Sequence, residues 1–474
     1  MRQNTLRGKM PCGWLQGTLQ MRFRDTLRVR AVLLMKLLVS GMLAVMAAGM
    51  PVEGAPLGGE TPPPRAQEGQ WIDFEECVRI ALERSPHLLK SALEVEVRHL
   101  DEADSRSSIV PSLFFETTYY VSRPEEEDHD RRRATIAFTT GSYNPVESYF
   151  SSKARGLVAE IAVLNHLRLI DDELYSMARK LIEAQALDET IALQEEMGAL
   201  AAKYRLYAQT RNSSGAASDL ETQVAEQEWK VLQAETARMI ELRTSIEDEI
   251  RFLLALSSDD ARRIDPGAAR EQAIGHFDPS VATLEKCREH CFALKIQKIR
   301  IALQQWNIKL AFTKYVPTLS FGLQSPDALN LAKDSDLHVA LGIRMRLWDG
   351  WERKRDVSRQ RLVMKQYESD ERATDKELER QWKAARRHLK SVSSALDLSI
   401  SAEKLARLKE QLSQARYESG EEPLSALVQN QRSRVQAQKA VVSAARDRDL
   451  AVLLLRYLSG DLFITYVHVA PFRE

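Results

Sequence analysis

The sequence is poor in residues that break regular structure. Among 474 residues there are only 20 glycines and 16 prolines, and residues 351–419 contain neither. Aromatic residues make up 7% of the chain, whereas charged residues make up 28%. This composition argues against a set of ordinary globular domains and favours a mostly helical protein with a large surface.

The sequence also lacks an excess of charge and a catalytic motif. Its 67 basic residues balance 67 acidic ones, so no overall field would attract nucleic acid. No nucleophile–base set, glycine-rich phosphate loop or paired catalytic carboxylate stands out. We therefore expect no nucleic-acid partner, no enzymatic activity and no cofactor.

Cysteine is scarce as well. Of four cysteines, Cys12 lies in a presequence, and the odd number that remains gives no disulfide framework. Cys287 and Cys291 lie four apart on an expected helix, where Cβ atoms are about 5–6 Å apart, too far for an unstrained bridge. With His290 they could suggest a metal site, but a structural site needs a fourth ligand and none is nearby in the sequence. We predict half-buried thiols and no metal.

The amino-terminal part has the pattern of an export signal. Lys36 precedes an uncharged stretch, 37–52, that is rich in Leu, Val, Met, Ala and Gly, and small residues follow it. This stretch is too short for a good membrane-spanning helix. The strongly basic residues 1–34 are either an overlong basic region or the result of a misassigned start, and we favour Met35 as the initiator. We assign residues 1–55 to this extension and signal peptide, and 56–70 to a proline-rich linker.

The most informative segment is a change of hydrophobic period between residues 337 and 419. Over 337–347 large apolar residues alternate with polar, charged or small ones, which predicts a strand with two different faces. After a short break at 348–350, nothing interrupts a helix over 351–419, which would be about 100 Å long at about 1.5 Å per residue. A long rod joined directly to a two-faced strand is unusual in a globular domain.

The same order of elements is predicted twice. In the first copy we expect a helix over 71–110 that Pro86 kinks or divides, strands over 112–122 and 134–141, a long helix over about 150–210 and a returning helix over 216–256. A shift of 206 residues aligns Pro111 with Pro317 and Leu88 with Leu294, which predicts a duplicated unit. The first repeat spans 71–265, the second 280–462, and a tail covers 463–474.

Four amphipathic strands cannot close a barrel, because the smallest membrane barrels need about eight. An open edge in lipid leaves unpaired backbone groups that each cost several kcal/mol. If the strands enter a membrane, several chains must therefore share one barrel, with the apolar face toward lipid and the other face toward a wet lumen. The lipid-facing candidates are Leu113, Phe115, Phe321, Val339, Leu341 and Ile343, and the lumen candidates are Glu116, Thr118, His338, Arg344 and Arg346.

Short motifs in a fixed order along residues 71–462 resemble the TolC-like outer-membrane efflux protein family. They are Ala-Leu-Glu-Arg-Ser-Pro at 81–86, Val-Pro-x-Leu at 110 and 316, Leu-Trp-Asp-Gly-Trp at 347–351, Tyr-Glu-Ser-Gly at 417–420 and Leu-Ser-Gly-Asp-Leu at 458–462. The resemblance implies a mainly α fold with a small β part. Three identical chains would each give four strands to a 12-stranded transmembrane β-barrel, and their long antiparallel helices would form a periplasmic α-barrel.

The resemblance also implies a location and partners. The protein would lie in the outer membrane of a Gram-negative-type envelope, in contact with its lipid, with a long periplasmic portion. It would be a passive exit duct that works with a periplasmic adaptor, or membrane fusion protein, and an inner-membrane pump of RND, ABC or MFS type, in efflux or type I secretion. We expect substrate specificity to lie on those other chains.

The family resemblance places a periplasmic tip at two helical turns, where such channels narrow and meet the adaptor. In the family an acidic residue often follows the turn glycine by six positions; Glu221 keeps this pattern and Ala426 departs from it. A ring of acidic residues would favour cations or bind a blocking metal, and the alternative is that they are solvated turn residues. The candidates are Gly215, Asp219, Glu221, Gly420, Glu421 and Glu422.

Two other functions stay open. One is a secreted periplasmic helical scaffold or spacer without a pore, whose strands remain in water. The other keeps the channel and assigns it to metal-cation efflux, on the basis of Cys287, His290 and Cys291.

Overall fold

A computed structural model describes residues 71–119, 134–216, 218–257, 262–325 and 338–467. All of them belong to one compact unit, Glu68–Glu474. The predicted signal peptide, the linker and the strand-connecting loops at 123–133 and 326–336 lie outside the described residues.

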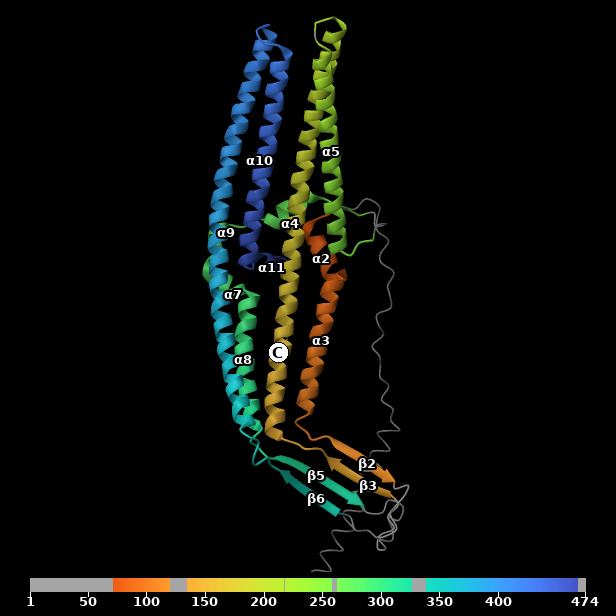
Figure 1. Ribbon diagram of the computed structural model, residues 1–474, viewed down its shortest axis with the longest axis vertical. Coiled ribbons are helices and arrows are strands. Elements are labelled where there is room, and N and C mark those ends of the chain that lie inside the picture. The colour runs from red at the N-terminus through yellow and green to blue at the C-terminus, as the bar shows by residue number, and fades with distance from the viewer. Residues whose placement is uncertain (1–70, 120–133, 217, 258–261, 326–337, 468–474) are drawn as a thin grey trace, which may run out of the picture. The chain divides into compact units, whose positions relative to one another are not determined.

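The described chain is mainly helical with two small sheets (Figure 1). The order of two helices, two strands, a long helix and a returning helix occurs in both halves, and β4, α6 and a short 3-10 helix stand between them. The helices are α2 (Phe74–Arg84), α3 (Pro86–Ser107), α4 (Pro145–Ser213), α5 (Asp219–Leu253), α6 (Pro266–Ile274), η1 (Pro279–Val281), α7 (Leu284–His290), α8 (Phe292–Thr313), α9 (Glu352–Glu418), α10 (Leu424–Leu458) and α11 (Asp461–Tyr466). The strands are β1 (Trp71–Ile72), β2 (Leu113–Tyr119), β3 (Ala134–Thr140), β4 (Arg263–Ile264), β5 (Thr318–Ser325) and β6 (His338–Arg344).

Both predicted long helices are present; α9 is within two residues of its predicted length, whereas α4 extends beyond the predicted range at both ends. Helix α4 has 69 residues and α9 has 67, so each extends about 100 Å at about 1.5 Å per residue. The Asn144 side chain caps α4 by accepting from the backbone N–H groups of Val146 and Glu147. Each long helix ends before a glycine in the left-handed region, Gly215 (φ 75°) and Gly420 (φ 80°), a conformation that glycine adopts without strain.

The leading helix breaks in both halves, and one break was not predicted. Ser85 separates α2 from α3 with an extended backbone (φ −60°, ψ 119°), as expected for the residue before a proline. Cys291 separates α7 from α8 in the same conformation (φ −63°, ψ 103°), so the prediction of one helix through Cys287 and Cys291 was wrong. No proline follows Cys291. Instead the ring of Phe292 packs edge-on against Phe463, with centroids 5.2 Å apart.

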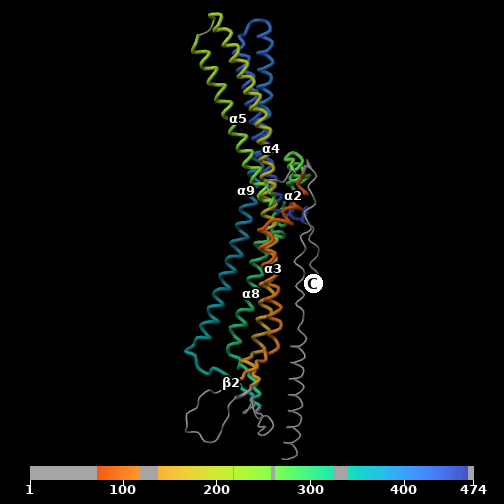
Figure 2. The backbone as a smooth tube through the Cα atoms, turned by 90° about the vertical axis from the view of Figure 1, so that its right-hand side faces the viewer, coloured from red at the N-terminus to blue at the C-terminus, as the bar shows by residue number. Residues whose placement is uncertain are grey.

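Helix α3 lies along the half of α4 that is nearer the four-stranded sheet, and α5 lies along the other half. In the same way α8 lies along the sheet half of α9 and α10 along its other half (Figures 1 and 2). Helix α4 also contacts α8 and α10, which joins the two halves. Figure 1 shows the four-stranded sheet at one end of α4 and α9 and the two helical turns at the other. None of the described helices is long and apolar enough to cross a membrane.

The main core lies near the middle of α4, where α2, α6, α10 and α11 meet it. Phe74, Leu181 and Leu453 are fully buried there, and parallel pairing of β1 with β4 closes one side. Burial of such side chains contributes roughly 1.5–3 kcal/mol each. This core fixes the middle of the helices, and both candidate functional regions lie at their ends.

Candidate functional site

The four-stranded sheet is antiparallel throughout, in the order β2-β3-β5-β6. Its register places Phe115 opposite Phe138, Phe138 opposite Leu323, and Leu323 opposite Val339. Directly paired residues share a face of a sheet. One row of apolar side chains therefore crosses all four strands. Within it the rings of Phe115 and Phe138 are in contact, with centroids 5.3 Å apart.

This apolar face contains every residue that the sequence analysis gives as lipid-facing. Phe321 lies opposite Leu341, and Leu319 lies opposite Ile343. The side chains of β6 are the most open, with Leu341 74% and Ile343 68% exposed. The candidates that share the face are Leu113, Phe115, Phe321, Val339, Leu341 and Ile343.

The opposite face is mostly small and polar, although Phe114 also lies on it, opposite Thr139. Its pairs include Thr139 with Gly322, Gly322 with Ala340, and Thr318 with Arg344. The lumen candidates Glu116, Thr118, His338 and Arg344 occupy positions on this face. Strand β6 ends at Arg344, so strand alternation does not place Arg346, whose lumen role stays a prediction. The Arg346 guanidinium lies 3.6 Å from the Glu352 carboxylate in an ion pair.

Both outer strands of this sheet are edges. Among the described residues, strands β2 and β6 each pair on one side only. An edge strand with a bare apolar face is a template for pairing with another chain. The described sheet thus has two free edges and an uncovered apolar face. Further strands would pair with the backbone groups of the edges, and an apolar environment would cover the face.

At the other end of the helices, most of the predicted tip acids have partners within the chain. Arg211 forms an ion pair with Glu221 at 3.4 Å, and the Asn212 side-chain amide donates to Asp219 at 3.0 Å. Both predicted turns are present, and Glu421 is exposed at the second one.

The Glu422 carboxylate accepts hydrogen bonds from two side chains of α9. The Ser413 hydroxyl donates to it at 2.6 Å and the Arg416 guanidinium at 3.0 Å. These hydrogen bonds, that of Ser413 first, lower the pKa of Glu422. Glu422 is therefore an ionised group with its charge partly compensated, which leaves Glu421 as the more open acid of this turn.

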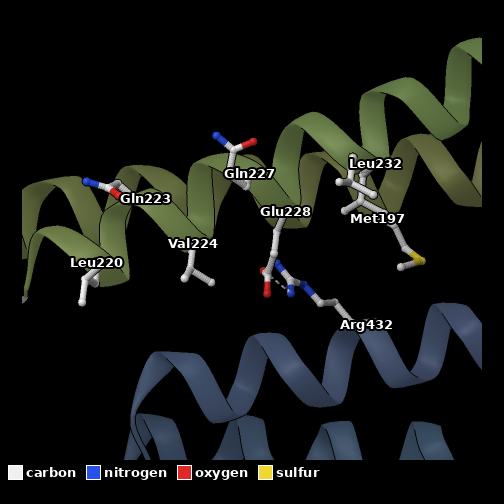
Figure 3. A pocket seen from close by; sticks show the side chains of 9 residues that line it. Met197, Leu220, Gln223, Val224, Gln227, Glu228, Leu232 and Arg432 are labelled. Atoms are coloured by element: carbon white, nitrogen blue, oxygen red, sulfur yellow. Dashed lines mark hydrogen bonds and ion pairs between the residues drawn. The ribbon is translucent and has the colours of Figure 1, made fainter.

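A groove near the first turn was missed by sequence reasoning. It has a volume of about 580 Å³ and lies between α5 and α10 (Figure 3). Leu220, Val224 and Val231 line it from α5, at spacings of four and seven residues that put them on one helix face. This spacing of apolar residues could have predicted an apolar stripe on α5 from the sequence. Arg432 reaches into the groove from α10 and pairs with Glu228 at 2.8 Å.

Polar side chains also tie the helical pair α4–α5 to the pair α9–α10. Arg434 of α10 pairs with Glu410 of α9 at 2.7 Å and with Glu196 of α4. The buried side chain of Gln194 accepts from Lys439 and donates to Glu235 at 3.0 Å. These contacts set the spacing of the two helical pairs on the way to the turns.

The cysteine cluster does not form a metal centre in the described part of the chain. Burial raises the pKa of the Cys287 thiol to about 11, which disfavours the thiolate that binds metal. His290 instead packs against Gly460, where an added Cβ would lie 2.6 Å from the Cβ of His290 and 2.9 Å from the Cγ of its imidazole. Within the described ranges, no group of three or more His, Cys, Asp or Glu residues is placed to hold a metal ion.

Comparison with solved structures identifies the fold. A membrane protein from Pseudomonas aeruginosa superposes with a TM-score of 0.71 at 17% identity, over 81% of this chain and 92% of that one. The outer membrane protein VceC from Vibrio cholerae gives 0.68 at 13% identity over 82% and 96%. The open state of the MtrE outer membrane channel of Neisseria gonorrhoeae gives 0.66 at 15% identity over 82% and 88%.

The chain has the fold of the TolC-family outer-membrane channels. The resemblance predicted from the sequence is thus confirmed at the level of the fold, which is mainly helical with a small antiparallel sheet. No protein-family model and no curated protein matches the sequence.

Proposed function

We propose that this chain is one subunit of an outer-membrane exit duct, a passive conduit from the periplasm to the exterior. The observation that carries the proposal is the sheet whose apolar face is uncovered and whose two edges are free in the part of the chain that the structure describes. Lipid would cover the apolar face, but it cannot satisfy a free edge. Pairing between copies would satisfy the edges and enclose a lumen lined by the small polar face.

Three copies would supply the 12 strands of a closed barrel, with β6 of one copy beside β2 of the next. The apolar face continues across this joint only if odd-numbered residues of β6 lie opposite odd-numbered residues of β2, because Ile343 and Phe115 share that face. The long helices of the three copies would continue the duct through the periplasm.

The helical turns are the proposed contact with a periplasmic adaptor. The groove lined by Val224 and Val231, crossed by the Glu228–Arg432 pair, offers an apolar strip with a charged rim, which suits an amphipathic helix. An inner-membrane pump of RND, ABC or MFS type would supply the energy, since a passive duct needs no catalytic centre.

The acids of the second turn are proposed to favour cations at the tip. We expect Glu421→Gln to lower the cation preference of reconstituted channels by about two-fold, because exposed acidic rings select by charge. Glu422→Gln should change it less, since Ser413 and Arg416 already engage that carboxylate. Reversal potentials in a salt gradient measure both variants, and equal effects would contradict this assignment.

Cysteine cross-linking tests the shared barrel. In a background with the native cysteines replaced by serine, Ile343→Cys is combined with cysteine at 113, 115 or 117. At least one of these combinations should yield covalent dimers and trimers upon oxidation, because opposed residues lie within disulfide reach. A link within one chain is excluded, since β2 and β6 are three strand spacings, about 14 Å, apart.

The matched control is Ile343→Cys with Glu116→Cys, one residue away on the opposite face. This pair should stay unlinked, as its side chains point away from each other. A monodisperse single subunit without detergent, with no cross-link at any odd position, would remove the duct proposal and leave the secreted scaffold.

A further inference from the structure

Helix α9 carries a row of basic residues on the side that faces away from its own chain. Within the chain α9 packs on α7, α8 and α10, through a side that includes the buried Ala385. Lys383 and Arg387 lie two residues before and after Ala385, roughly opposite it on a helix with about 3.6 residues per turn. Exposed basic residues recur along this outer side every three or four positions, and we call them the basic stripe: Arg372, Lys376, Arg380, Lys383, Arg387 and Lys390.

The charge of the basic stripe is poorly balanced within the described part of the chain. Arg380 pairs with Glu377 at 2.6 Å and Lys383 pairs with Glu379 at 2.5 Å. The other four members have no ion pair with any described residue, and no acidic residue occurs between 380 and 396. Like charges three or four positions apart destabilise a helix. An acidic surface from outside the chain would offset this repulsion.

Helix α5 presents acidic residues on its own outer side. Its Ile250 is fully buried in the main core, and Asp248 and Phe252 lie two residues to either side, so they face away from the chain. Glu241 lies two and a half turns before Ile250 and shares this outer side. Phe252 is 72% exposed, and both acids are exposed and have no ion pair among the described residues. We call Glu241 and Asp248 the outer acids of α5.

The basic stripe and the outer acids lie at the same height along the helices. Ala385 of α9 shares a small apolar cluster with the end of α10. In that end of α10, Tyr457 packs on Tyr175 of α4 with ring centroids 4.7 Å apart. Five residues further along α4, Lys180 pairs with Glu249 of α5 at 2.5 Å. The middle of the basic stripe and the carboxyl-terminal end of α5 are therefore level to within about one helical turn.

The two surfaces lie at opposite edges of the helical layer. Figure 1 shows α9 at one edge of the layer and α3 and α5 at the other. Helix α9 follows β6 and α3 precedes β2, so these edges continue the two free edges of the sheet. A second copy placed with its β2 beside β6 of the first would bring its outer acids to the basic stripe. Such a contact between two different surfaces can close into a ring.

We propose that the basic stripe of each subunit docks on the outer acids of α5 in the next copy. Arg387 and Lys390 would face Asp248, and Lys383 would lie against the ring of Phe252, a contact that favours cations. Opposite charges at one height would set the order and the axial register in which subunits join, because a shift along the helices separates them. The inference rests on the proposed function, since it assumes the shared barrel. An acidic polymer would cover the basic stripe but would leave the outer acids without a partner.

Charge reversal on the two surfaces, singly and together, tests the proposal. The trimer fraction of the detergent-solubilised full-length protein is measured on dilution by analytical ultracentrifugation. We expect Arg387→Glu with Lys390→Glu to lower that fraction about five-fold, and Glu241→Lys with Asp248→Lys to do the same, because each pair brings like charges together. A chain with all four substitutions should regain most of the wild-type fraction, since every contact then joins opposite charges. These differences should shrink at about 1 M salt.

The matched control is Arg386→Glu with Lys404→Glu, two exposed basic residues of α9 that lie about 100° around the helix from the basic stripe. It should leave the trimer fraction unchanged. If neither reversed pair lowers the fraction, or if the four substitutions together do not restore it, the docking proposal fails.

Two further results separate the docking proposal from the exit duct and from an acidic polymer. If the docking proposal fails while Ile343→Cys still cross-links to an odd-numbered position of β2, the duct stands. If that cross-link is missing in a chain without charge reversals, the proposed function fails as well. If Arg387→Glu with Lys390→Glu leaves the trimer intact but abolishes retention on immobilised polyglutamate, an acidic polymer covers the basic stripe and docking between subunits is overturned.

Discussion

Leu341→Arg is expected to prevent most of the protein from assembling in the outer membrane. Leu341 lies opposite Phe321 on the apolar face and is 74% exposed within the chain. An arginine facing lipid near the middle of the bilayer costs about 2–4 kcal/mol in a β-barrel. The cost applies to every copy, so a symmetric assembly incurs it several times. The amount of heat-modifiable oligomer in detergent-extracted outer membranes measures the effect.

Ala340→Arg is the matched control for Leu341→Arg. Ala340 is the adjacent residue of β6 and lies opposite Gly322 on the small polar face, where an arginine would reach a wet lumen. We expect near-normal amounts of oligomer. If the protein is a secreted scaffold with its sheet in water, Leu341→Arg should be tolerated better than Ala340→Arg, because Leu341→Arg would only replace an exposed apolar side chain. Equal tolerance at both positions would count against insertion in a membrane.

The sequence predicts the faces of the sheet well, because alternation is local. The parity of residues 337–347 already separates Leu341 from Ala340, and the pairing of β5 with β6 leaves that separation intact. The register between β3 and β5 was beyond sequence reasoning, since it joins residues far apart in the chain, such as Phe138 and Leu323, which are 185 positions apart. The uninterrupted helix was predictable for the same local reason, the absence of glycine and proline.

The features that were missed depend on contacts between distant segments. No proline follows the helix break at Cys291; the residue after the break, Phe292, packs on Phe463. The partners of Glu422 are six and nine residues away across a turn, which a count of acidic residues does not reveal. The groove beside Arg432 depends on α5 and α10, which are joined there by the ion pair of Arg432 with Glu228. Lipid-facing and lumen roles of individual residues remain predictions.

Asp171→Asn is expected to stabilise the protein above neutral pH. Asp171 lies on α4 within the main core, is only 6% exposed, and its Oδ1 atom has no hydrogen-bond partner in the described chain. Burial, followed by the charge of Asp172, raises the pKa of Asp171 to about 7. Asp172 itself accepts from the Tyr457 hydroxyl at 2.5 Å and lies 3.7 Å from Arg168.

The sign of the pH effect follows from that raised pKa. In the unfolded chain Asp171 loses its proton near its ordinary value of 3.8, whereas in the folded chain it keeps the proton until about 7. Wild-type stability therefore falls between these two pH values and stays reduced above them. A difference of about three units corresponds to roughly 4 kcal/mol, which asparagine would recover at pH 8 but not near pH 4.

Thermal unfolding of the detergent-solubilised protein at several pH values measures this effect. The Tm gain of Asp171→Asn over wild type should grow as the pH rises from 4 to 7 and then level off. Asp172→Asn removes only the neighbouring charge, which is the lesser cause of the raised pKa of Asp171; its Tm gain should therefore follow the same pH direction and be smaller. A gain from Asp171→Asn that is the same at every pH would assign the effect to packing rather than to ionisation of a buried carboxyl.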